Sequence, residues 1–255
     1  MSLFNLKNKS ILITGSSRGI GKSIAIECAK HGAKVIVSSR NLKSCINTSE
    51  EINNLIGNEV AFSIQANIGV EDDLKNLVKQ SREKIGKIDV LVCNAATNPF
   101  MGSMLDMSNE KFEKVMKNNI SSNQILCNLV IPEMIDRNDG SIIIISSIAA
   151  IKGSPILGAY NISKAADVMI VKNIAAEFGH KNIRANSIAP GLIKTDFAKA
   201  LWDNPDILKN VLKSTPMNRI GEPEEIAGVA VMLASKAGNY INGETIVVDG
   251  GTTIT

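Results

Sequence analysis

A tyrosine and a lysine, Tyr160 and Lys164, lie four positions apart in the stretch Tyr-Asn-Ile-Ser-Lys. If this stretch is helical, both side chains lie on one face, one turn apart. A neighbouring ammonium favours the charged form of a phenol, and such a phenol can act as a general acid or base at a carbonyl or alcohol oxygen. The same spacing is also typical of a pair on an exposed helix face, so other motifs must decide between the two interpretations.

A serine could add a second group to this chemistry. Ser147 follows an apolar run that is expected to be a strand, and it precedes Tyr160 by 13 residues. That gap can hold a strand-end turn and a loop before the helix that carries Tyr160 and Lys164. The hydroxyl and the phenol could then converge on one substrate oxygen and polarise a carbonyl.

A glycine-rich turn near the start of the chain has the composition of a phosphate-binding site. Residues 14–21 read Thr-Gly-Ser-Ser-Arg-Gly-Ile-Gly, a spacing that differs from both G-x-G-x-x-G and the P-loop. Glycine lets the backbone approach a ligand closely, and the free N–H groups and dipole of a helix N-terminus attract phosphate. A tight strand-to-helix turn would also need small residues, but the position in the first strand–helix unit favours a dinucleotide.

The end of the second expected strand indicates which dinucleotide is bound. It reads Val37-Ser38-Ser39-Arg40, without the acidic residue that an NAD site would place near the adenosine ribose. Ser39, Arg40 and Arg18 together suit a 2′-phosphate, because guanidinium groups can hold it through paired hydrogen bonds. Two solvated surface arginines are the alternative. We expect NADPH to be preferred over NADH.

Short apolar runs alternate with longer amphipathic stretches along the whole chain. Several runs are apolar on both faces, as expected for parallel strands that helices cover above and below. This alternation predicts an α/β, doubly wound Rossmann fold, whose ligands bind beyond the carboxyl ends of the strands. The seven expected strands are residues 10–14, 34–38, 60–64, 88–93, 141–146, 184–188 and 245–248.

Length and composition exclude several other classes of protein. The chain has 255 residues, 44% hydrophobic and 21% charged, and we interpret residues 1–255 as one domain. A net charge of +3 without a dense basic patch gives no reason to expect nucleic acid. The four cysteines and two histidines have no metal-ligand spacing. Because no apolar run suits a membrane span or a signal peptide, and no cysteine pairs are evident, we expect a cytoplasmic protein without membrane contact.

Five motifs, in this order and spacing, resemble the short-chain dehydrogenase/reductase (SDR) family. Each motif alone is modest, but five in register are specific, and the likeness covers essentially the whole chain. The motifs are Thr14–Gly21, Asn94-Ala95-Ala96, Ser147, Tyr160-x-x-x-Lys164 and Pro190-Gly191-x-x-x-Thr195, and the resemblance ends with Val248-Asp249-Gly250-Gly251.

The resemblance implies a role for each matching residue. Tyr160 would be the proton donor to a carbonyl and the base in the reverse reaction, while Lys164 would assist it and hold the nicotinamide ribose. Ser147 would bond the substrate oxygen, and Asn119 would complete a proton relay through water, with Asn118 a near competitor. The other cofactor-binding residues would be Gly15, Ser17, Arg18, Gly19, Ile20, Gly21, Ser39, Arg40, Asn67, Ile68, Asn94, Ala95, Pro190, Gly191, Ile193 and Thr195.

Some positions depart from the family pattern or from ordinary helix patterning. An alanine, Ala96, replaces the last glycine of the usual Asn-Asn-Ala-Gly, which leaves Asn94 in place. Asn67 stands where an acidic residue is common after the third strand, and it could still bond adenine. Asn118 and Asn119 lie in an expected long helix over Lys111–Met134, where an asparagine is usually on the exposed face.

The resemblance also implies that residues 192–218 form the mobile lid over the substrate, although ordinary helix packing explains this segment equally well. The lid segment contains the sole tryptophan and no cluster of charges, and the opposite wall, Asn94–Met104, contains Pro99, Phe100 and Met101. A pocket of this kind is apolar with few polar anchors. These walls suggest a ketone or aldehyde on an apolar skeleton.

We therefore expect an NADPH-dependent carbonyl reductase that reduces a ketone or aldehyde by hydride transfer, with Tyr160 as proton donor. The resemblance also implies a homotetramer, with interfaces on helices at 108–134 and 158–180 and on the C-terminal strand. One alternative within the class is a 3-oxoacyl-[acyl-carrier-protein] reductase. An alternative of another class is a non-catalytic dinucleotide-sensing protein, which would typically lack the tyrosine or the lysine.

Overall fold

The computed structural model describes residues 2–255, which are built on a seven-stranded parallel sheet. Its strands lie in the order β3-β2-β1-β4-β5-β6-β7, so the strand order reverses direction between β1 and β4. The strands are β1 Ser10–Thr14, β2 Lys34–Ser39, β3 Ala61–Gln65, β4 Val90–Cys93, β5 Gly140–Ile145, β6 Ile183–Pro190 and β7 Thr245–Val248. The predicted single-domain Rossmann fold is confirmed, with some strand ends shifted by one or two residues.

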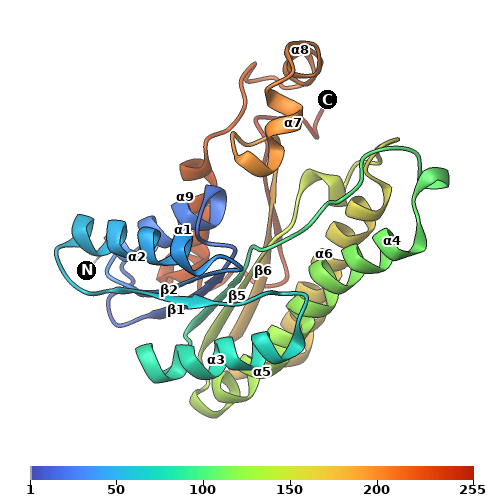
Figure 1. Cartoon of the computed structure of the whole chain (residues 1–255). Helices are drawn as coiled ribbons and strands as arrows, with labels where there is room; N and C mark the ends of the chain where they lie inside the picture. The colour runs from blue at the N-terminus through green and yellow to red at the C-terminus, as the bar shows by residue number, and fades with distance from the viewer. Residues whose placement is uncertain (1) are drawn as a thin grey trace.

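Helices cover both faces of the sheet (Figure 1). Helices α1, α2 and α9 pack into one buried apolar cluster, and α3, α5 and α6 pack into the other. The helices are α1 Gly19–Lys30, α2 Leu42–Ile56, α3 Glu71–Ile85, α4 Asn109–Met116, α5 Ser122–Arg137, α6 Gly158–Phe178, α7 Lys199–Trp202, α8 Pro205–Lys213 and α9 Pro223–Ala234. Short helical turns are η1 Met104–Asp106, η2 Lys117–Ser121, η3 Ile148–Ala150, η4 Gly179–Lys181, η5 Asp196–Ala198 and η6 Lys236–Gly238.

Strand β5 shows why this sequence forms a sheet that is buried on both sides. All six of its residues are buried, and four of them are isoleucines. Ile143 belongs to the cluster under α1 and α9, whereas Ile142 and Ile144 belong to the cluster under α5 and α6. Side chains alternate across a strand, so an apolar run of this kind is stable only where helices cover both faces.

The expected long helix around Lys111–Met134 is interrupted. A π-helical turn, η2, separates α4 from α5, and Asn118 and Asn119 lie within it. Both asparagines are buried, with Asn119 fully inaccessible, so the expectation that they face solvent is wrong. A π turn changes the direction in which its side chains point, and here the amides find partners inside the protein.

The described part of the chain, residues 2–255, contains no helix that is both long and apolar enough to cross a membrane. Within the same residues, no three His, Cys, Asp or Glu side chains are grouped so that they could hold a metal ion.

Candidate active site

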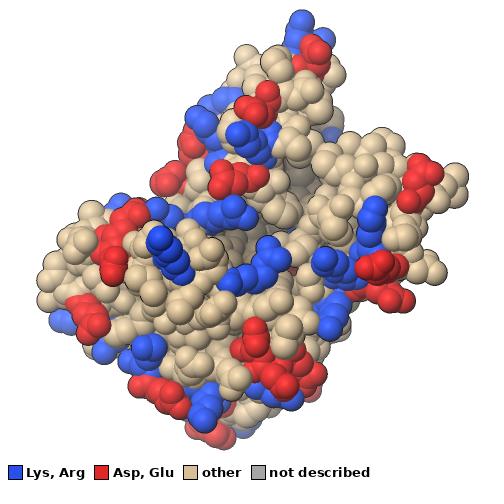
Figure 2. Space-filling model, viewed as in Figure 1, with Lys and Arg blue, Asp and Glu red and all other residues tan. Residues whose placement is uncertain are grey.

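The expected functional motifs lie together because each follows the carboxyl end of a parallel strand. The glycine-rich turn follows β1, Arg40 follows β2, Asn94 follows β4, and Ser147 follows β5. In a doubly wound sheet this edge is the ligand-binding edge, above all where the strand order reverses. Figure 2 shows lysine and arginine side chains gathered around a hollow in the middle of the viewed face.

The glycine-rich turn has the shape of an anion cradle. Gly15 and Gly19 have φ angles of +64° and +56°, a region that favours glycine. A Cβ on Gly15 would lie 2.9 Å from the Asn94 side-chain nitrogen, so only glycine fits there. Helix α1 begins after Arg18 without a side-chain cap, whereas Asn41 caps α2. The first N–H groups of α1 are therefore available to a pyrophosphate.

Asn94 holds this turn in place. Its Nδ2 donates to the main-chain oxygens of Thr14, at 2.9 Å, and Gly15, at 3.0 Å. The Thr14 hydroxyl in turn accepts the N–H groups of Asn94 and Ala95, at 3.0 and 3.1 Å. These bonds join the ends of β1 and β4 at the reversal of strand order, so Asn94 shapes the turn through its side chain.

The residues expected at the adenosine end lie after β2, in the glycine-rich turn and after β3. Arg40 is exposed, and Ser39 is half-buried with its hydroxyl near the Cys45 sulfur, at 3.1 Å. The Arg18 guanidinium lies 3.6 Å from the Asp196 carboxylate, and both side chains are exposed. The Asn67 side-chain oxygen accepts the Gly69 N–H at 3.1 Å, which leaves its NH₂ group for a ligand.

Tyr160 and Lys164 lie on the first turns of α6, as the spacing predicts. Lys164 is only 3% exposed, and its Nζ lies 5.7 Å from the centre of the Tyr160 ring. The ammonium donates to the main-chain oxygen of Ile145, at 2.8 Å, and to Asp167 Oδ2, at 2.9 Å. The lysine is therefore held inside the protein beside the tyrosine, and the interpretation as an exposed surface pair is wrong.

The surroundings of Lys164 keep its ammonium charged. Burial alone acts to lower the pKa of Lys164, but the Asp167 carboxylate, through its charge and its hydrogen bond, does most to outweigh it, and the pKa lies above its ordinary value. Burial also raises the pKa of Asp167, against the opposing effects of Lys164 and Asn123. Buried charges are tolerated when they are paired and hydrogen-bonded, and both conditions are met here.

Ser147 lies two residues after the end of β5, close to where the sequence predicts. It is half-buried, and its hydroxyl accepts the Ala149 N–H at 3.1 Å, so the hydroxyl hydrogen remains available to a substrate. The neighbouring Ser146 donates to the main-chain oxygen of Lys164 at 2.8 Å. That bond joins the end of β5 to α6, the helix that carries Tyr160.

Of the two competing asparagines, Asn119 is the one that contacts the tyrosine helix. Its Oδ1 accepts the Thr97 N–H at 2.8 Å, and its Nδ2 donates to the Thr97 oxygen and the Ser163 hydroxyl, both at 3.0 Å. The Ser163 hydroxyl in turn donates a hydrogen bond to the main-chain oxygen of Tyr160, at 2.8 Å. Among residues 2–255, the side chain of Asn118 hydrogen-bonds only to the Thr97 hydroxyl, at 3.4 Å. Because the side chain of Asn119 is fully used, a relay through this residue would have to use its main-chain oxygen.

The segment after β6 lies at the same carboxyl edge of the sheet as the other motifs. Leu192 and Lys194 bond through their main chains to Gly221, at 3.0 and 2.9 Å. Alternate residues of an extended segment point their backbone groups to opposite sides, so the Ile193 amide faces away from Gly221. Thr195 lies against the glycine-rich turn, since a Cβ on Gly19 would be 3.3 Å from its methyl carbon.

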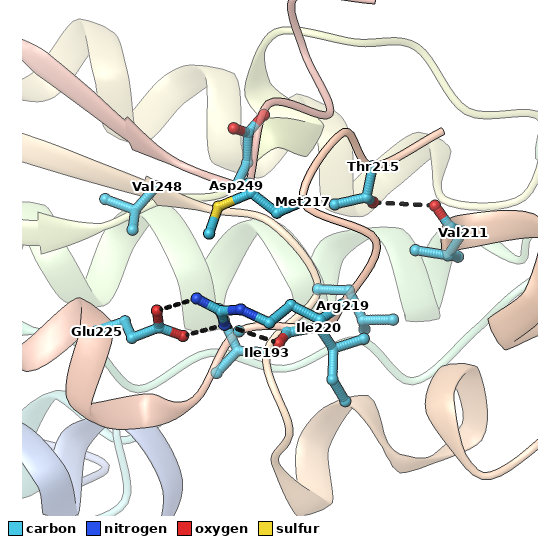
Figure 3. Close-up of a pocket in the computed structure, with 12 residues that line it drawn as sticks. Ile193, Val211, Thr215, Met217, Arg219, Ile220, Glu225, Val248 and Asp249 are labelled. Carbon is cyan, nitrogen blue, oxygen red and sulfur yellow. Dashed lines mark hydrogen bonds and ion pairs between the residues drawn. The ribbon is translucent and has the colours of Figure 1, made fainter. Parts of the chain in front are cut away.

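A small cavity of about 90 Å³ lies at the base of the expected lid (Figure 3). It contains neither Tyr160 nor Lys164. Arg219 and Glu225 face each other across two contacts of 2.7 and 2.6 Å, and the guanidinium lowers the pKa of Glu225 to about 2. This ion pair joins the segment after α8 to the first turn of α9. The lining residues are Leu192, Ile193, Val211, Thr215, Met217, Arg219, Ile220, Gly221, Glu225, Val248, Asp249 and Gly250.

Four residues that hold the expected catalytic groups were not predicted from the sequence: Thr97, Asn123, Ser163 and Asp167. Two of them could have been predicted from their spacing along the sequence. Asp167 follows Lys164 by three positions, and Asn123 follows Asn119 by four, which on a helix places each pair on one face. Thr97 carried no such signal, because its partner is distant along the chain.

The fold and the site together define a class of protein. A parallel Rossmann sheet, an uncapped glycine-rich turn at the reversal of strand order, and a buried Tyr–Lys pair at the same edge are the parts of a nicotinamide-dinucleotide oxidoreductase. Enzymes of this class act on alcohol and carbonyl groups.

Comparison with known proteins identifies the family within this class. The family model described as "Enoyl-(Acyl carrier protein) reductase" matches residues 15–253. The chain is 40% identical to dehydrogenase/reductase SDR family member 4 of Bos taurus over 248 residues, 97% of this chain and 88% of that protein. The Homo sapiens protein of the same name matches with the same identity and coverage. The chain belongs to the short-chain dehydrogenase/reductase family.

Solved structures agree with this assignment. One neighbour is 7α-hydroxysteroid dehydrogenase complexed with NADH and 7-oxo glycochenodeoxycholic acid, with a TM-score of 0.92, 37% identity, and coverage of 98% of this chain and 96% of that one. Another is gluconate 5-dehydrogenase from Burkholderia cenocepacia in complex with NADP and tartrate, with a TM-score of 0.94, 29% identity, and coverage of 99% and 98%. The neighbours thus include complexes with either dinucleotide.

Proposed function

We propose that this protein is an NADPH-dependent carbonyl reductase that converts a ketone or aldehyde into an alcohol. The observation that carries the proposal is the buried Lys164 ammonium, fixed beside the Tyr160 ring at the edge where the glycine-rich turn lies. A positive charge that is fixed and dehydrated in this way strongly stabilises the negative charge that develops on a neighbouring phenol as it gives up its proton.

In the proposed reaction the chain supplies acid catalysis and orientation. The cofactor, when bound, supplies the hydride that reduces the carbonyl carbon. Tyr160 donates its phenolic proton to the carbonyl oxygen, and the Lys164 ammonium stabilises the phenolate that remains. Ser147 donates a hydrogen bond to the same oxygen and so orients the carbonyl. Proton donation by a positioned side chain is worth about 10²- to 10⁴-fold in rate.

Replacing Tyr160 with phenylalanine tests this proposal. Tyr160→Phe removes only the hydroxyl, so we expect kcat for ketone reduction to fall by roughly 10²- to 10⁴-fold with little change in the dissociation constant of NADPH. Steady-state kinetics and nicotinamide fluorescence titration measure the two quantities. Activity that survives the substitution would show that the proton comes from another group.

The preference for NADPH rests on charge at the adenosine end. Arg40 is exposed after β2, and Arg18 is exposed at the start of α1, where the only ion pair it makes in residues 2–255 is the long one with Asp196. The segment from Val37 to Arg40 has no carboxylate that would favour the ribose hydroxyls of NADH. Both guanidinium groups are free to turn toward a 2′-phosphate.

The remaining cofactor contacts follow the family pattern. We propose that Gly15, Ser17, Gly19, Ile20 and Gly21 form the pyrophosphate cradle. Toward the adenine and the nicotinamide we propose Asn67, Ile68, Asn94, Ala95, Pro190, Gly191, Ile193 and Thr195. The uncapped N-terminus of α1 and the outward-facing amide of Ile193 support these assignments.

We further propose that residues 192–218 are the substrate lid and that the substrate skeleton is apolar. The ring of Phe197, at the start of this segment, lies 6.2 Å from the ring of Tyr160. Apolar side chains on both walls are exposed, including Met101, Met104 and Met217. Such a surface suits an apolar ketone or aldehyde better than a sugar acid.

Two alternatives are separated by the same assays. Lysine and arginine side chains around the hollow in Figure 2 would also suit the acidic carrier of a 3-oxoacyl-[acyl-carrier-protein] reductase. Faster turnover of an acetoacetyl thioester than of a simple diketone would favour that activity. A dinucleotide sensor would bind NADPH but turn over neither compound, so Tyr160→Phe would have no activity to remove.

We propose a cytoplasmic homotetramer. The four cysteines are buried free thiols, which supports a reducing compartment. Helix α6 exposes Ile162 and Met169, seven positions apart, and β7 exposes Val247. Apolar side chains on these two surfaces support contacts between copies of the chain through both of them.

A further inference from the structure

The ammonium of Lys164 has a hydrogen-bonding arrangement that leaves little freedom. An ammonium has three N–H donors, and Lys164 uses one on the Ile145 carbonyl and one on Asp167 Oδ2. One donor remains for the nicotinamide ribose that the proposed function assigns to this lysine. The direction of that donor is set by the two bonds already made.

Asp167 is itself oriented by a second residue. It is fully buried, and its Oδ1 accepts from Asn123 Nδ2 at 2.9 Å while its Oδ2 binds the lysine. Asn123 also donates to the main-chain oxygen of Asn119 at 2.8 Å. The amide group has two N–H donors, so both are used and the side chain cannot rotate without losing a bond.

These contacts form one continuous chain of protein groups. It runs from the Lys164 ammonium through Asp167 and Asn123 to the main-chain oxygen of Asn119 in the π-helical turn. A π turn displaces backbone carbonyls from the regular helical pattern, and the Asn123 side chain supplies a partner for this one. This series of hydrogen bonds thereby couples the position of the lysine to the π-helical turn that packs on α6.

We propose that Asp167, oriented by Asn123, is a positioning residue for Lys164: it holds the buried ammonium charged and directs its free N–H toward the cofactor. The inference rests on the proposed function, because it assigns Lys164 to cofactor binding and proton transfer. It goes beyond that function by assigning a role to two residues that touch neither the substrate oxygen nor the phenol.

The titratable groups around Lys164 predict how its pKa would change if the Asp167 carboxylate were removed. Of residues 2–255, the titratable groups that face Lys164 are Tyr160 and Asp167 on α6 and Cys93 at the end of β4. Strand β5 contributes only the Ile145 carbonyl, and α5 contributes neutral amides. Contact with Cys127 and burial raise the pKa of Cys93, so it stays a neutral thiol. Without Asp167, burial would act on the lysine with no carboxylate opposing it, and the pKa of Lys164 would fall.

The test is Asp167→Asn, which removes the charge and keeps the shape. A lysine with a lowered pKa is still charged in acid and becomes neutral as the pH rises. We therefore expect the variant to bind NADPH nearly as well as wild type at about pH 6, and to lose roughly tenfold or more in affinity as the pH rises past the lowered pKa, which is the worth of one charged hydrogen bond. Nicotinamide fluorescence titration measures binding without turnover, and kcat for a diketone should decline in parallel.

The matched control is Asp89→Asn at the other end of the sheet. Asp89 is also buried, and its carboxylate pairs with Lys87 at 2.9 Å, just before β4. The control should lose thermal stability and keep the wild-type pH profile. If Asp167→Asn behaves like the control, or loses binding equally at every pH, Asp167 has only a structural role.

A second variant keeps the inference testable if Asp167→Asn does not fold. Asn123→Leu leaves the carboxylate charge but removes its orienting bond, so we expect weaker NADPH binding at all pH values without a new pH dependence. Unchanged binding in this variant would overturn the role of Asn123. Wild-type turnover of carbonyl compounds tests the proposed function separately, since these comparisons between variants are read from binding alone.

Discussion

Lys164, Asp167 and Asn119 are polar side chains that the fold buries almost completely. Asp167 and Asn119 are stable there because their hydrogen-bonding groups have protein partners, and Lys164 is stable because two of its three N–H donors do. The charges of the lysine and the aspartate also compensate each other. Burial removes the water that would weaken their electrostatic effect on a bound substrate. At the scale of single residues, the chemistry therefore depends on a dry environment in which one lysine donor is left for a ligand.

Arg40 allows a residue-scale test of cofactor choice. Arg40→Ala removes one guanidinium from the adenosine end of the site, and we expect KM for NADPH to rise roughly 10- to 100-fold, since a hydrogen bond to a charged group is worth roughly 1.5–3 kcal/mol. KM for NADH should change little, because NADH lacks the phosphate. Steady-state kinetics with both cofactors measure the change.

Lys43→Ala is the control for this substitution, because it removes an equal charge from a nearby exposed position on α2. It should leave the ratio of kcat/KM for NADPH and NADH unaltered. Wild-type activity with NADH that equals or exceeds activity with NADPH would contradict the cofactor assignment itself.

Two elements give the site its asymmetry: the π-helical turn η2 on one side and the lid segment on the other. The turn brings Asn119 to Ser163 and Thr97, and these contacts fix the start of α6. The lid segment stands beyond the carboxyl edge of the sheet as α7 and α8 (Figure 1). One side of the site is thus bonded to the interior of the protein. The other is attached through the loop after β6, the ion pair between Arg219 and Glu225, and hydrogen bonds to the segment after β7.

The sole tryptophan reports on the lid element. Trp202 ends α7, and its indole N–H donates to the main-chain oxygen of Thr195 at 2.8 Å. If the lid closes over an apolar substrate, the indole enters a drier environment, and its emission should shift to shorter wavelength. Adding an alcohol product to the protein saturated with NADP⁺ and recording tryptophan fluorescence checks this. An emission spectrum that stays the same at saturation would contradict closure. The Trp202→Phe variant measures the emission that does not come from Trp202.

On the scale of the whole molecule, the two apolar clusters account for stability, and exposed apolar residues remain to be explained. Ile162 and Met169 on α6 are 43% and 54% exposed. Exposed apolar residues that cluster on one helix face indicate a protein–protein contact more strongly than scattered ones do. The far side of α6 from the sheet is therefore the surface on which we expect another copy of the chain.

Light scattering on the purified protein tests the assembly. We expect the mass of four chains for wild type and a smaller assembly for Met169→Glu, because a carboxylate buried in an interface has no partner there. Leu55→Glu is the control, since Leu55 is 56% exposed on α2, away from the expected interfaces. A wild-type mass of one chain would contradict the tetramer.

The sequence by itself determined the strand–helix order, the parallel sheet and the place of each motif. These follow from local patterns: apolar runs on both faces give buried parallel strands, and glycines before a helix predict a phosphate-binding turn. The i,i+4 spacing of Tyr160 and Lys164 needed only helix geometry to place them together.

The tertiary structure alone decided which polar groups are buried and which partners they have. Whether Lys164 faces water or the interior depends on β5 and α5 packing against α6, and no local pattern contains that contact. The π-helical turn, the contact of Asn119 with Ser163, and the Asp167–Asn123 link likewise depend on residues more than twenty positions apart. Hydrogen bonds between distant segments form only after the chain has folded, so their energies cannot be read from neighbouring residues.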